Sequence, residues 1–289
     1  MNDIMIQTPQ TLEELKNYLS IADESTYILG GGTDFIINMN KNNVYDGTFI
    51  DLTGINELNY IKKENGFIKI GATTTFTDLS ENEMITTETQ CVAQAASMVG
   101  STQIRNCATI AGNVANASQA ADCIPALMCL NAKVKIMNGK GIVIEKNVEE
   151  VVLGINKNCL KKDEVIVEIL IPIKNSDYKS AFCKVGSRSS VTISKLNIAV
   201  SLKIGQVIEE ASVVIGSLGE KAFHSTICEE CLINKEINEE LFTTFKEKLK
   251  YQVDLAIPNR KSKSYKREAI LGIADNIIEK LFWNCYRRL

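Results

Sequence analysis

Apolar and polar positions follow two different periods along this chain, and together they predict short strands mixed with helices. Thr11 and Glu14 have the spacing of a capping box, which marks the start of a helix. Asn65-Gly66 lies between two alternating runs and is typical of a tight hairpin turn. In the N-terminal part we expect helices over residues 11–20 and 87–100, strands over 26–29 and 49–52, and a hairpin over 59–70.

Periodicity is weak in the middle of the chain and returns in its C-terminal half. Residues 104–121 are rich in small side chains, so we expect a loop there that leads into a helix starting near Asp122. A polar break between Pro172 and Tyr178 predicts a domain boundary near residue 175. Further elements are expected over 134–144 and 202–217 (hairpins), 165–171 and 178–185 (strands), and 238–251 and 264–286 (helices). The pattern predicts an α+β fold with one domain over residues 1–175 and a second over 176–289.

Composition supports a folded protein and disfavours several classes of partner. The 289 residues are 45% hydrophobic and 23% charged, with a net charge of -3, so the chain can form a core. Nucleic-acid binding needs a basic face, and only short basic runs occur. The sequence has no apolar stretch of about 18 residues and no secretory leader, so we expect a cytoplasmic protein that does not enter a membrane. Nine scattered cysteines fit a reducing compartment.

Two segments of small residues are candidates for binding an anion: Gly30-Gly31-Gly32-Thr33-Asp34 and Thr109-Ile110-Ala111-Gly112-Asn113. Glycine lets a backbone approach a bulky anion, and successive N–H groups in such a turn form a concave set of donors for phosphate. The alternative is a pair of tight turns without a ligand. Phe35 stands where a dinucleotide-binding G-x-G-x-x-G motif needs its last glycine, and no Gly-Lys-Ser/Thr follows as in a Walker loop.

The glycine segment is the first of several stretches that point to one family when they are taken together. The others are Gln103–Asn113, Asp122–Leu127, Val167–Pro172, Ser180–Lys184 and Arg260–Lys266. In this combination the sequence resembles the FAD-binding subunit of the molybdenum hydroxylases, the family of xanthine dehydrogenase and carbon monoxide dehydrogenase. The resemblance spans nearly the whole chain. It implies an FAD-binding domain of the vanillyl-alcohol oxidase type, made of two α/β subdomains, plus a smaller C-terminal α+β domain.

The resemblance also implies roles for individual residues. Both small-residue segments would wrap the FAD pyrophosphate, with backbone N–H groups and the hydroxyls of Thr33 and Thr109 as donors. Asp122 would accept hydrogen bonds from the cofactor's hydroxyl groups, and Lys184 would be the cation near the cofactor. Asn113 would contact the flavin or its phosphates, and Ile166 would lie near the ring. The cofactor-binding residues so implied are Tyr27, Ile28, Leu29, Gly30, Gly31, Gly32, Thr33, Asp34, Thr109, Ile110, Ala111, Gly112, Asn113, Asp122, Ile166 and Lys184, with no catalytic or metal-binding residue among them.

The family's division of labour implies an electron-transfer role. Electrons would pass from a molybdopterin centre through [2Fe–2S] clusters on partner subunits to FAD, and then to NAD or another acceptor. This chain has no C-x4-C-x2-C spacing for a cluster, so it would be the flavin subunit. Xanthine or another purine is the first expectation for the substrate of the complex, and nicotinate-type heterocycles, aldehydes and carbon monoxide stay open.

One group of residues could form a second kind of site. Cys228 and Cys231, with His224 four residues before the first of them, have the spacing of half a zinc site or of a redox pair, but ordinary packing is favoured.

Two other functions stay open beside electron transfer. A self-contained flavin oxidase is a second possible function, and the single histidine offers it little for substrate chemistry. A third possible function is a scaffold protein without flavin. The presence of the other residues of the two segments argues against it, because turns alone would need only the glycines. The first segment offers no histidine for a covalent flavin link, so non-covalent FAD is expected, and Cys107 beside the second segment stays open as an attachment point. Trp283 and Tyr286 are expected to anchor the last helix.

Overall fold

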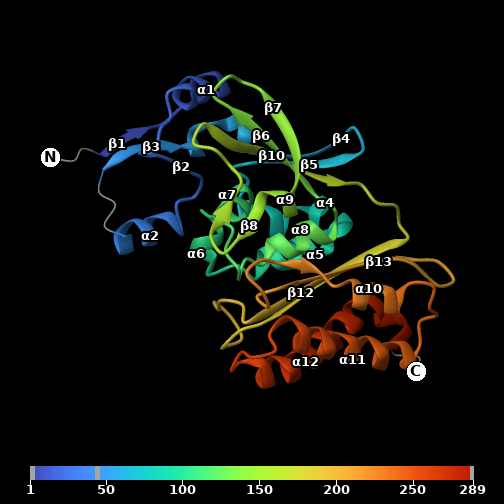
Figure 1. Ribbon diagram of the computed structural model, residues 1–289. Helices are drawn as coiled ribbons and strands as arrows, with labels where there is room; N and C mark the ends of the chain where they lie inside the picture. Colours follow the sequence, from blue (N-terminus) through green and yellow to red (C-terminus); the bar gives the residue numbers. More distant parts are fainter. Residues whose placement is uncertain (1–3, 43–45, 287–289) are drawn as a thin grey trace. The chain divides into compact units, whose positions relative to one another are not determined.

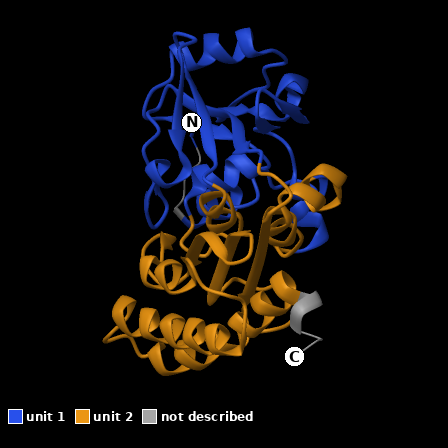
Figure 2. Ribbon diagram, turned by 90° about the vertical axis from the view of Figure 1, so that its right-hand side faces the viewer, with its two compact units in different colours: residues 1–78, 101–117, 131–173 blue, residues 79–100, 118–130, 174–289 orange. Residues whose placement is uncertain are grey.

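The computed structural model describes residues 4–42 and 46–286 (Figure 1). The side chains of residue 42 and of residues 283–286, and with them the expected anchors Trp283 and Tyr286, lie outside this description. Contacts divide the chain into two compact units (Figure 2). Unit 1 contains residues 1–78, 101–117 and 131–173, and unit 2 contains residues 79–100, 118–130 and 174–289. Two short segments, residues 79–100 and 118–130, thus belong to unit 2 although the residues on both sides of the pair in the sequence belong to unit 1. The expected domain boundary near residue 175 stays a prediction.

The first sheet of unit 1 has three parallel strands in the order β1-β3-β2. Its elements are β1 (Ile4–Gln7), α1 (Leu12–Ser20), β2 (Thr26–Leu29), α2 (Phe35–Asn42) and β3 (Gly47–Asp51). The predicted start of α1 is confirmed, because the Glu14 backbone N–H donates to the Thr11 hydroxyl at 3.2 Å. The second bond of a capping box is not made, since the Glu14 carboxylate accepts from the Gln10 backbone N–H. Helix α2 was not expected. It follows the glycine turn directly, and the Phe35 ring at its start lies 5.3 Å from Tyr27 and 5.6 Å from Phe49.

The second sheet of unit 1 has five antiparallel strands in the order β4-β5-β10-β6-β7. They are β4 (Ile61–Glu64), β5 (Phe67–Gly71), β6 (Lys133–Asn138), β7 (Val143–Asn147) and β10 (Glu164–Pro172). Asn65 and Gly66 both have positive φ, 52° and 79°, as a primed hairpin turn requires, so this turn is confirmed. Strand β10 lies in the centre and has a bulge between Ile166 and Glu168. Shorter elements of this part of the chain are α3 (Phe76–Glu81), α9 (Val148–Val151), β8 (Val152–Gly154) and β9 (Lys157–Asn158).

The expected loop over residues 104–121 is wrong for part of its length. It contains α7 (Ile110–Asn116), and the end of α6 (Thr102–Arg105) overlaps its start. Helix α7 is short, and its small residues and two asparagines give no regular apolar period, which is why the pattern did not reveal it. Tertiary contacts make up for this, because Ile110 and Val114 are fully buried and α7 contacts β10.

Unit 2 is built around a four-stranded antiparallel sheet in the order β11-β12-β13-β14. The strands are β11 (Tyr178–Val185), β12 (Leu196–Ile204), β13 (Ile208–Gly216) and β14 (Phe223–His224). Helices α5 (Gln90–Ser97) and α8 (Cys123–Cys129) lie against one side of this sheet, and α10 (Thr226–Leu232), α11 (Glu239–Ala256) and α12 (Lys263–Tyr286) lie against the other (Figure 1). Helix α4 (Glu83–Glu88) precedes α5. The structure confirms the expected mixture of helices and sheets. Among the described helices, none is long and apolar enough to cross a bilayer.

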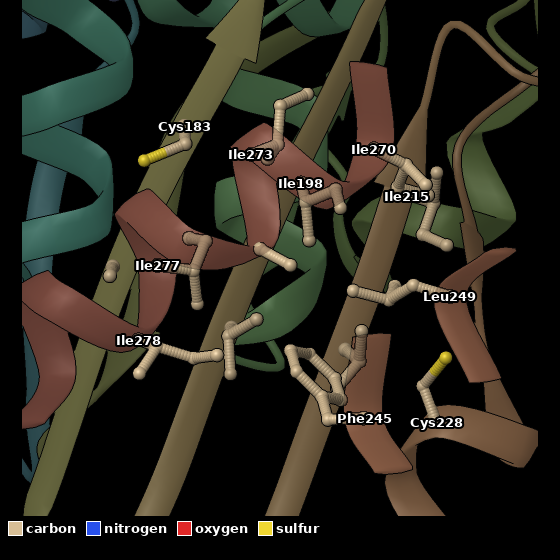
Figure 3. Close-up of a cluster of buried hydrophobic side chains, with 14 of the residues drawn as sticks. Cys183, Ile198, Ile215, Cys228, Phe245, Leu249, Ile270, Ile273, Ile277 and Ile278 are labelled. Carbon is tan, nitrogen blue, oxygen red and sulfur yellow. The ribbon is translucent and has the colours of Figure 1, made fainter. Parts of the chain in front are cut away.

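Strand alternation explains the core of unit 2. Cys183, Ile198 and Ile215 point toward the C-terminal helices and meet Ile277 of α12 and Leu249 of α11 (Figure 3). Their sequence neighbours face α5 and α8, as the hydrogen bond from the Cys91 backbone N–H to the Ser180 hydroxyl shows at 3.2 Å. The sheet is thus covered on both faces, which explains why β12 is buried along most of its length.

One position in this unit allows a simple test of the helix assignment. Gly272 lies inside α12, is exposed, and has nothing within 4 Å of an added Cβ atom. Gly272→Ala is expected to raise the free energy of unfolding by about 0.5–1 kcal/mol, because alanine loses less backbone entropy in a helix. Denaturant unfolding measures the effect. Gly216→Ala is the control with the opposite sign, since its Cβ would lie 2.1 Å from Asn197 Oδ1. A Gly272→Ala variant that is no more stable than the parent would contradict the assignment.

Candidate functional site

The first small-residue segment forms a turn between β2 and α2 with its N–H groups available. Gly32 has φ +67°, a conformation that L side chains rarely adopt. Within the described part of the chain, the backbone N–H groups of Gly31, Gly32 and Thr33 donate no hydrogen bond. Three successive unpaired N–H groups in a half-buried turn are the arrangement that binds phosphate oxygens.

The structure brings the second small-residue segment against the first, inside unit 1. An added Cβ on Gly31 would lie 1.7 Å from the Cys107 carbonyl oxygen, and one on Gly30 would lie 2.5 Å from Thr109 Oγ1. Gly31 therefore cannot carry a side chain without separating the two segments, whereas a Cβ on Gly30 would displace the Thr109 hydroxyl. The Thr109 hydroxyl accepts the Gly112 backbone N–H at 3.2 Å, which leaves its own proton free to donate. The sequence left Cys107 open as a point of covalent flavin attachment, and the structure shows that its backbone carbonyl is the group that meets Gly31.

Two asparagines of α7 complete this part of the site. Asn113 Oδ1 is buried, and it has no hydrogen-bond partner among the described residues. A buried polar atom without a partner is costly, so it marks a position where a ligand donor would fit. The Asn116 side-chain amide donates to Asp34 Oδ2 at 2.7 Å and so ties α7 to the glycine turn. Asn116 was missed by sequence reasoning, because a bond between residues 82 positions apart leaves no local signal.

The other expected residues of unit 1 lie in β2, α7 and β10. The Tyr27 ring stacks on Phe49 with 5.2 Å between centroids, directly before Ile28 and Leu29 lead into the turn. Ile110 and Ala111 are buried in α7, and Ile166 is buried in β10. A contact between Ile166 and a flavin ring stays a prediction.

Asp122 and Lys184, which both belong to unit 2, form a buried ion pair. Their Nζ–Oδ2 distance is 2.6 Å, and the side chains are only 6% and 8% exposed. Lys184 Nζ also donates to the backbone carbonyls of Met98, at 2.8 Å, and Thr192, at 3.1 Å. These three bonds use all three N–H donors of the ammonium group.

The Asp122 carboxylate has two further donors. Its Oδ1 accepts from the Ser194 hydroxyl at 2.5 Å and from Asn197 Nδ2 at 2.9 Å. Asp122 stands before α8 but caps no N–H group of that helix. The carboxylate is therefore held by protein donors, and its bond to cofactor hydroxyl groups stays a prediction. Ser194 and Asn197 lie more than 70 residues from Asp122, and no sequence pattern indicated them.

The two cysteines of α10 have thiols that do not ionise readily. Burial raises the pKa of the Cys228 thiol to about 12 and that of the Cys231 thiol to about 11, so both are protonated at neutral pH. Cys231 Sγ donates to the Cys228 backbone carbonyl at 3.1 Å. His224 Nδ1 lies 3.0 Å from Glu229 Oε1, which also accepts the Val213 backbone N–H. In the described part of the chain, no three His, Cys, Asp or Glu side chains are grouped as metal ligands would be.

The paired segments of unit 1 and the two-sided sheet of unit 2 each lie within a sequence match to a known family. The family described as FAD binding domain in molybdopterin dehydrogenase matches residues 2–174. The chain belongs to this family. A second match, to the CO dehydrogenase flavoprotein C-terminal domain, covers residues 181–281. The protein is thus an FAD-binding medium subunit of the molybdenum hydroxylase type and an oxidoreductase subunit, as the resemblance implied.

Relatives and solved structures agree along the whole chain. The nicotinate dehydrogenase FAD-subunit of Eubacterium barkeri is 32% identical over 288 residues, which is 98% of this chain and 96% of that protein. The glyceraldehyde dehydrogenase medium chain of Sulfolobus acidocaldarius is 27% identical and covers 90% of this chain, with 92% of its own length matched. In structure, the chain is similar to one from the carbon monoxide dehydrogenase of Hydrogenophaga pseudoflava, with a TM-score of 0.86, 20% identity and 98% of each chain covered. The structural likeness confirms the expected fold.

Proposed function

We propose that this chain binds FAD non-covalently through the two segments joined in unit 1, and that it transfers electrons within a larger complex. The observation that carries the proposal is the close approach of Gly31 to the Cys107 carbonyl, which places two sets of small residues at one position. The N–H groups of Gly31, Gly32 and Thr33 would hold one phosphate of the pyrophosphate. The Thr109 hydroxyl and the Nδ2 group of Asn113 would donate to the other.

The residues present fit this cofactor. Asn113 Oδ1 is a buried acceptor that a cofactor hydroxyl or N–H group would satisfy. The glycines let the second segment approach the turn, since a Cβ on Gly31 would meet the Cys107 carbonyl. Bound FAD would accept single electrons from iron–sulfur clusters and could release them in pairs as hydride. The chain's own contribution is to bind and orient the cofactor and to set the polarity around it, and transfer itself requires no acid or base.

The partners would be an iron–sulfur subunit and a molybdopterin-binding subunit. The support is the family assignment and the sequence, which has no cysteine spacing for a [2Fe–2S] cluster. We propose NAD as an acceptor, with another carrier as the alternative, and the cytoplasm as the compartment. The substrate would be chosen by the molybdopterin subunit. Xanthine or another purine is the first expectation, and nicotinate gains support from the 32% identity to a nicotinate dehydrogenase subunit.

The cofactor proposal predicts FAD and not FMN, because two phosphate-binding segments match a pyrophosphate better than one terminal phosphate. Acid precipitation of the purified chain is expected to release all of its flavin, and chromatography is expected to identify this flavin as FAD. Recovery of FMN would contradict the proposal. So would the absence of flavin after reconstitution with excess FAD, which would favour the scaffold.

The subunit proposal predicts that the isolated chain does not react with the substrate of the complex. Dithionite, and NADH if NAD is the natural acceptor, are expected to bleach the flavin absorbance under anaerobic conditions. Xanthine, nicotinate and an aldehyde are expected to leave it unchanged. Adding the two partner subunits is expected to restore substrate-dependent bleaching. Bleaching by one of these substrates without a partner would instead support a self-contained oxidase.

A further inference from the structure

The basic run near the start of α12 contains one lysine that differs from its neighbours. Lys263 and Arg267 extend to the surface and pair with Asp254, at 3.1 Å and 3.4 Å. Lys266 is only 8% exposed and donates from Nζ to the Ser217 backbone carbonyl at 2.5 Å. Burying an ammonium group is unfavourable, and both this burial and the nearby Arg260 lower the pKa of Lys266. A lysine kept in such a place calls for a role that an apolar residue could not fill.

Ser217, the partner of Lys266, has an unfavourable backbone conformation. Its φ is +59°, in the left-handed region that residues other than glycine rarely adopt. Such a residue persists only where its surroundings hold it. Lys266 holds its carbonyl on one side, and on the other side its own N–H donates to the Gln119 carbonyl at 3.1 Å.

Through Ser217, Lys266 is connected to the segment that carries Asp122. Residues 119–122 are fixed at two further points, because Asn197 Nδ2 donates to the Ala121 carbonyl at 3.2 Å and to Asp122 Oδ1 at 2.9 Å. Gly216, next to Ser217, lies so close to Asn197 that an added Cβ would be 2.1 Å from its Oδ1. The end of β13, Asn197 and the segment before α8 therefore form one contiguous contact within unit 2.

We propose that Lys266 is a positioning residue that fixes the segment of residues 119–122 by holding Ser217 in its left-handed conformation. This inference rests on the proposed function, and it also assumes the role that the resemblance implies for Asp122, which is to accept hydrogen bonds from the cofactor.

A positioning role and a space-filling role of Lys266 predict different results for Lys266→Met. If the lysine served only to fill space, an apolar side chain of similar length would leave stability unchanged or raise it, since no charge would be buried. A positioning role predicts that Ser217 loses its conformation and that the bond from its N–H to Gln119 opens. Hydrogen exchange of the Ser217 amide is then expected to speed up roughly tenfold or more, while the amides of β12 keep their protection.

Three variants make the test specific. Lys263→Met, at a surface lysine of the same helix turn, is the matched control and is expected to leave Ser217 exchange unchanged. Lys266→Met/Ser217→Gly is expected to recover most of the lost protection, because glycine adopts positive φ without strain. If Lys266→Met does not fold, Lys266→Gln, whose shorter side chain cannot reach the carbonyl, takes its place with the same expected result.

The cofactor supplies a second measurement. Lys266→Met is expected to weaken FAD binding about fivefold or more, with recovery in the double variant. Unchanged Ser217 exchange in Lys266→Met would overturn the inference, whatever happens to FAD. Faster exchange with unchanged FAD affinity would also overturn it, because the segment would then be irrelevant to binding. Failure of the parent chain to bind FAD would instead contradict the proposed function, while the exchange experiment would still report on Lys266.

Discussion

Asp122→Asn is expected to lower the free energy of unfolding by about 3–5 kcal/mol, the usual range when one partner of a buried ion pair is removed. The carboxylate is replaced by a neutral amide of the same shape, which removes the charge that lies 2.6 Å from the Lys184 ammonium and leaves one oxygen for the donors of Lys184, Ser194 and Asn197. The lysine cannot turn to water, because its side chain is 8% exposed and its other two donors are fixed by backbone carbonyls. Denaturant unfolding of the parent and the variant gives the difference directly.

Two controls separate this effect from general loss of charge. Asp275→Asn removes the carboxylate of an exposed pair with Lys246, at 2.5 Å, and is expected to cost at most about 1 kcal/mol. Asp122→Asn/Lys184→Met replaces the buried pair by neutral groups and is expected to regain most of the lost stability. Equal losses in the exposed and the buried variant would show that burial does not set the energy of the pair.

The double variant also tests the role that the resemblance gives to Asp122. If its carboxylate bonds directly to cofactor hydroxyl groups, the folded double variant is expected to bind FAD more weakly by roughly 1.5–3 kcal/mol, the range for hydrogen bonds to a charged group. Unchanged FAD affinity would assign the pair to the stability of unit 2 alone. Stability and affinity are thus measured on the same protein and need not change together.

Local sequence signals were sufficient where the structure depends on neighbouring residues. The hairpin at Asn65-Gly66 and the start of α1 at Thr11 each depend on a turn or cap within a few residues, and both were predicted. Helix α7 was not, because small residues give no periodicity and its stability comes from contacts of Ile110 and Val114 with distant elements. Helix α2 was hidden for a similar reason, since the pattern after the glycine turn shows no clear apolar face.

The residues of the candidate site likewise include some that local sequence signals indicated and others that they did not. Both small-residue segments were found from the sequence, because glycine residues indicate turns and close backbone approaches without reference to distant residues. Their partners were not, since the bonds from Asn116 to Asp34 and from Asn197 to Asp122 join residues 82 and 75 positions apart. Lys184 was expected to serve the cofactor, and only the structure shows that its three donors are already used within unit 2. Residue type indicated the chemistry, and topology decided which groups meet.

The second large effect is expected for Gly31→Ala, which should reduce FAD affinity at least about a hundredfold, or by about 2.7 kcal/mol. A Cβ on Gly31 would lie 1.7 Å from the Cys107 carbonyl oxygen and 2.4 Å from its carbon. Both are backbone atoms, so no side chain can rotate away and the two segments must separate. The proposed phosphate donors of the glycine turn would then move away from Thr109 and Asn113. Isothermal titration of the flavin-free variant with FAD measures the loss.

The matched control is Gly66→Ala, in the hairpin between β4 and β5 of the same unit. Gly66 has positive φ, +79°, and nothing lies within 4 Å of an added Cβ. The control therefore introduces backbone strain of about 1 kcal/mol without a clash, and it is expected to leave FAD affinity unchanged. If Gly31→Ala folds and binds FAD as tightly as this control, the pyrophosphate cannot lie where the two segments meet. The anion-binding role would then have to be given to a different part of the chain, because the close approach at Gly31 is the feature that distinguishes this turn from an ordinary one.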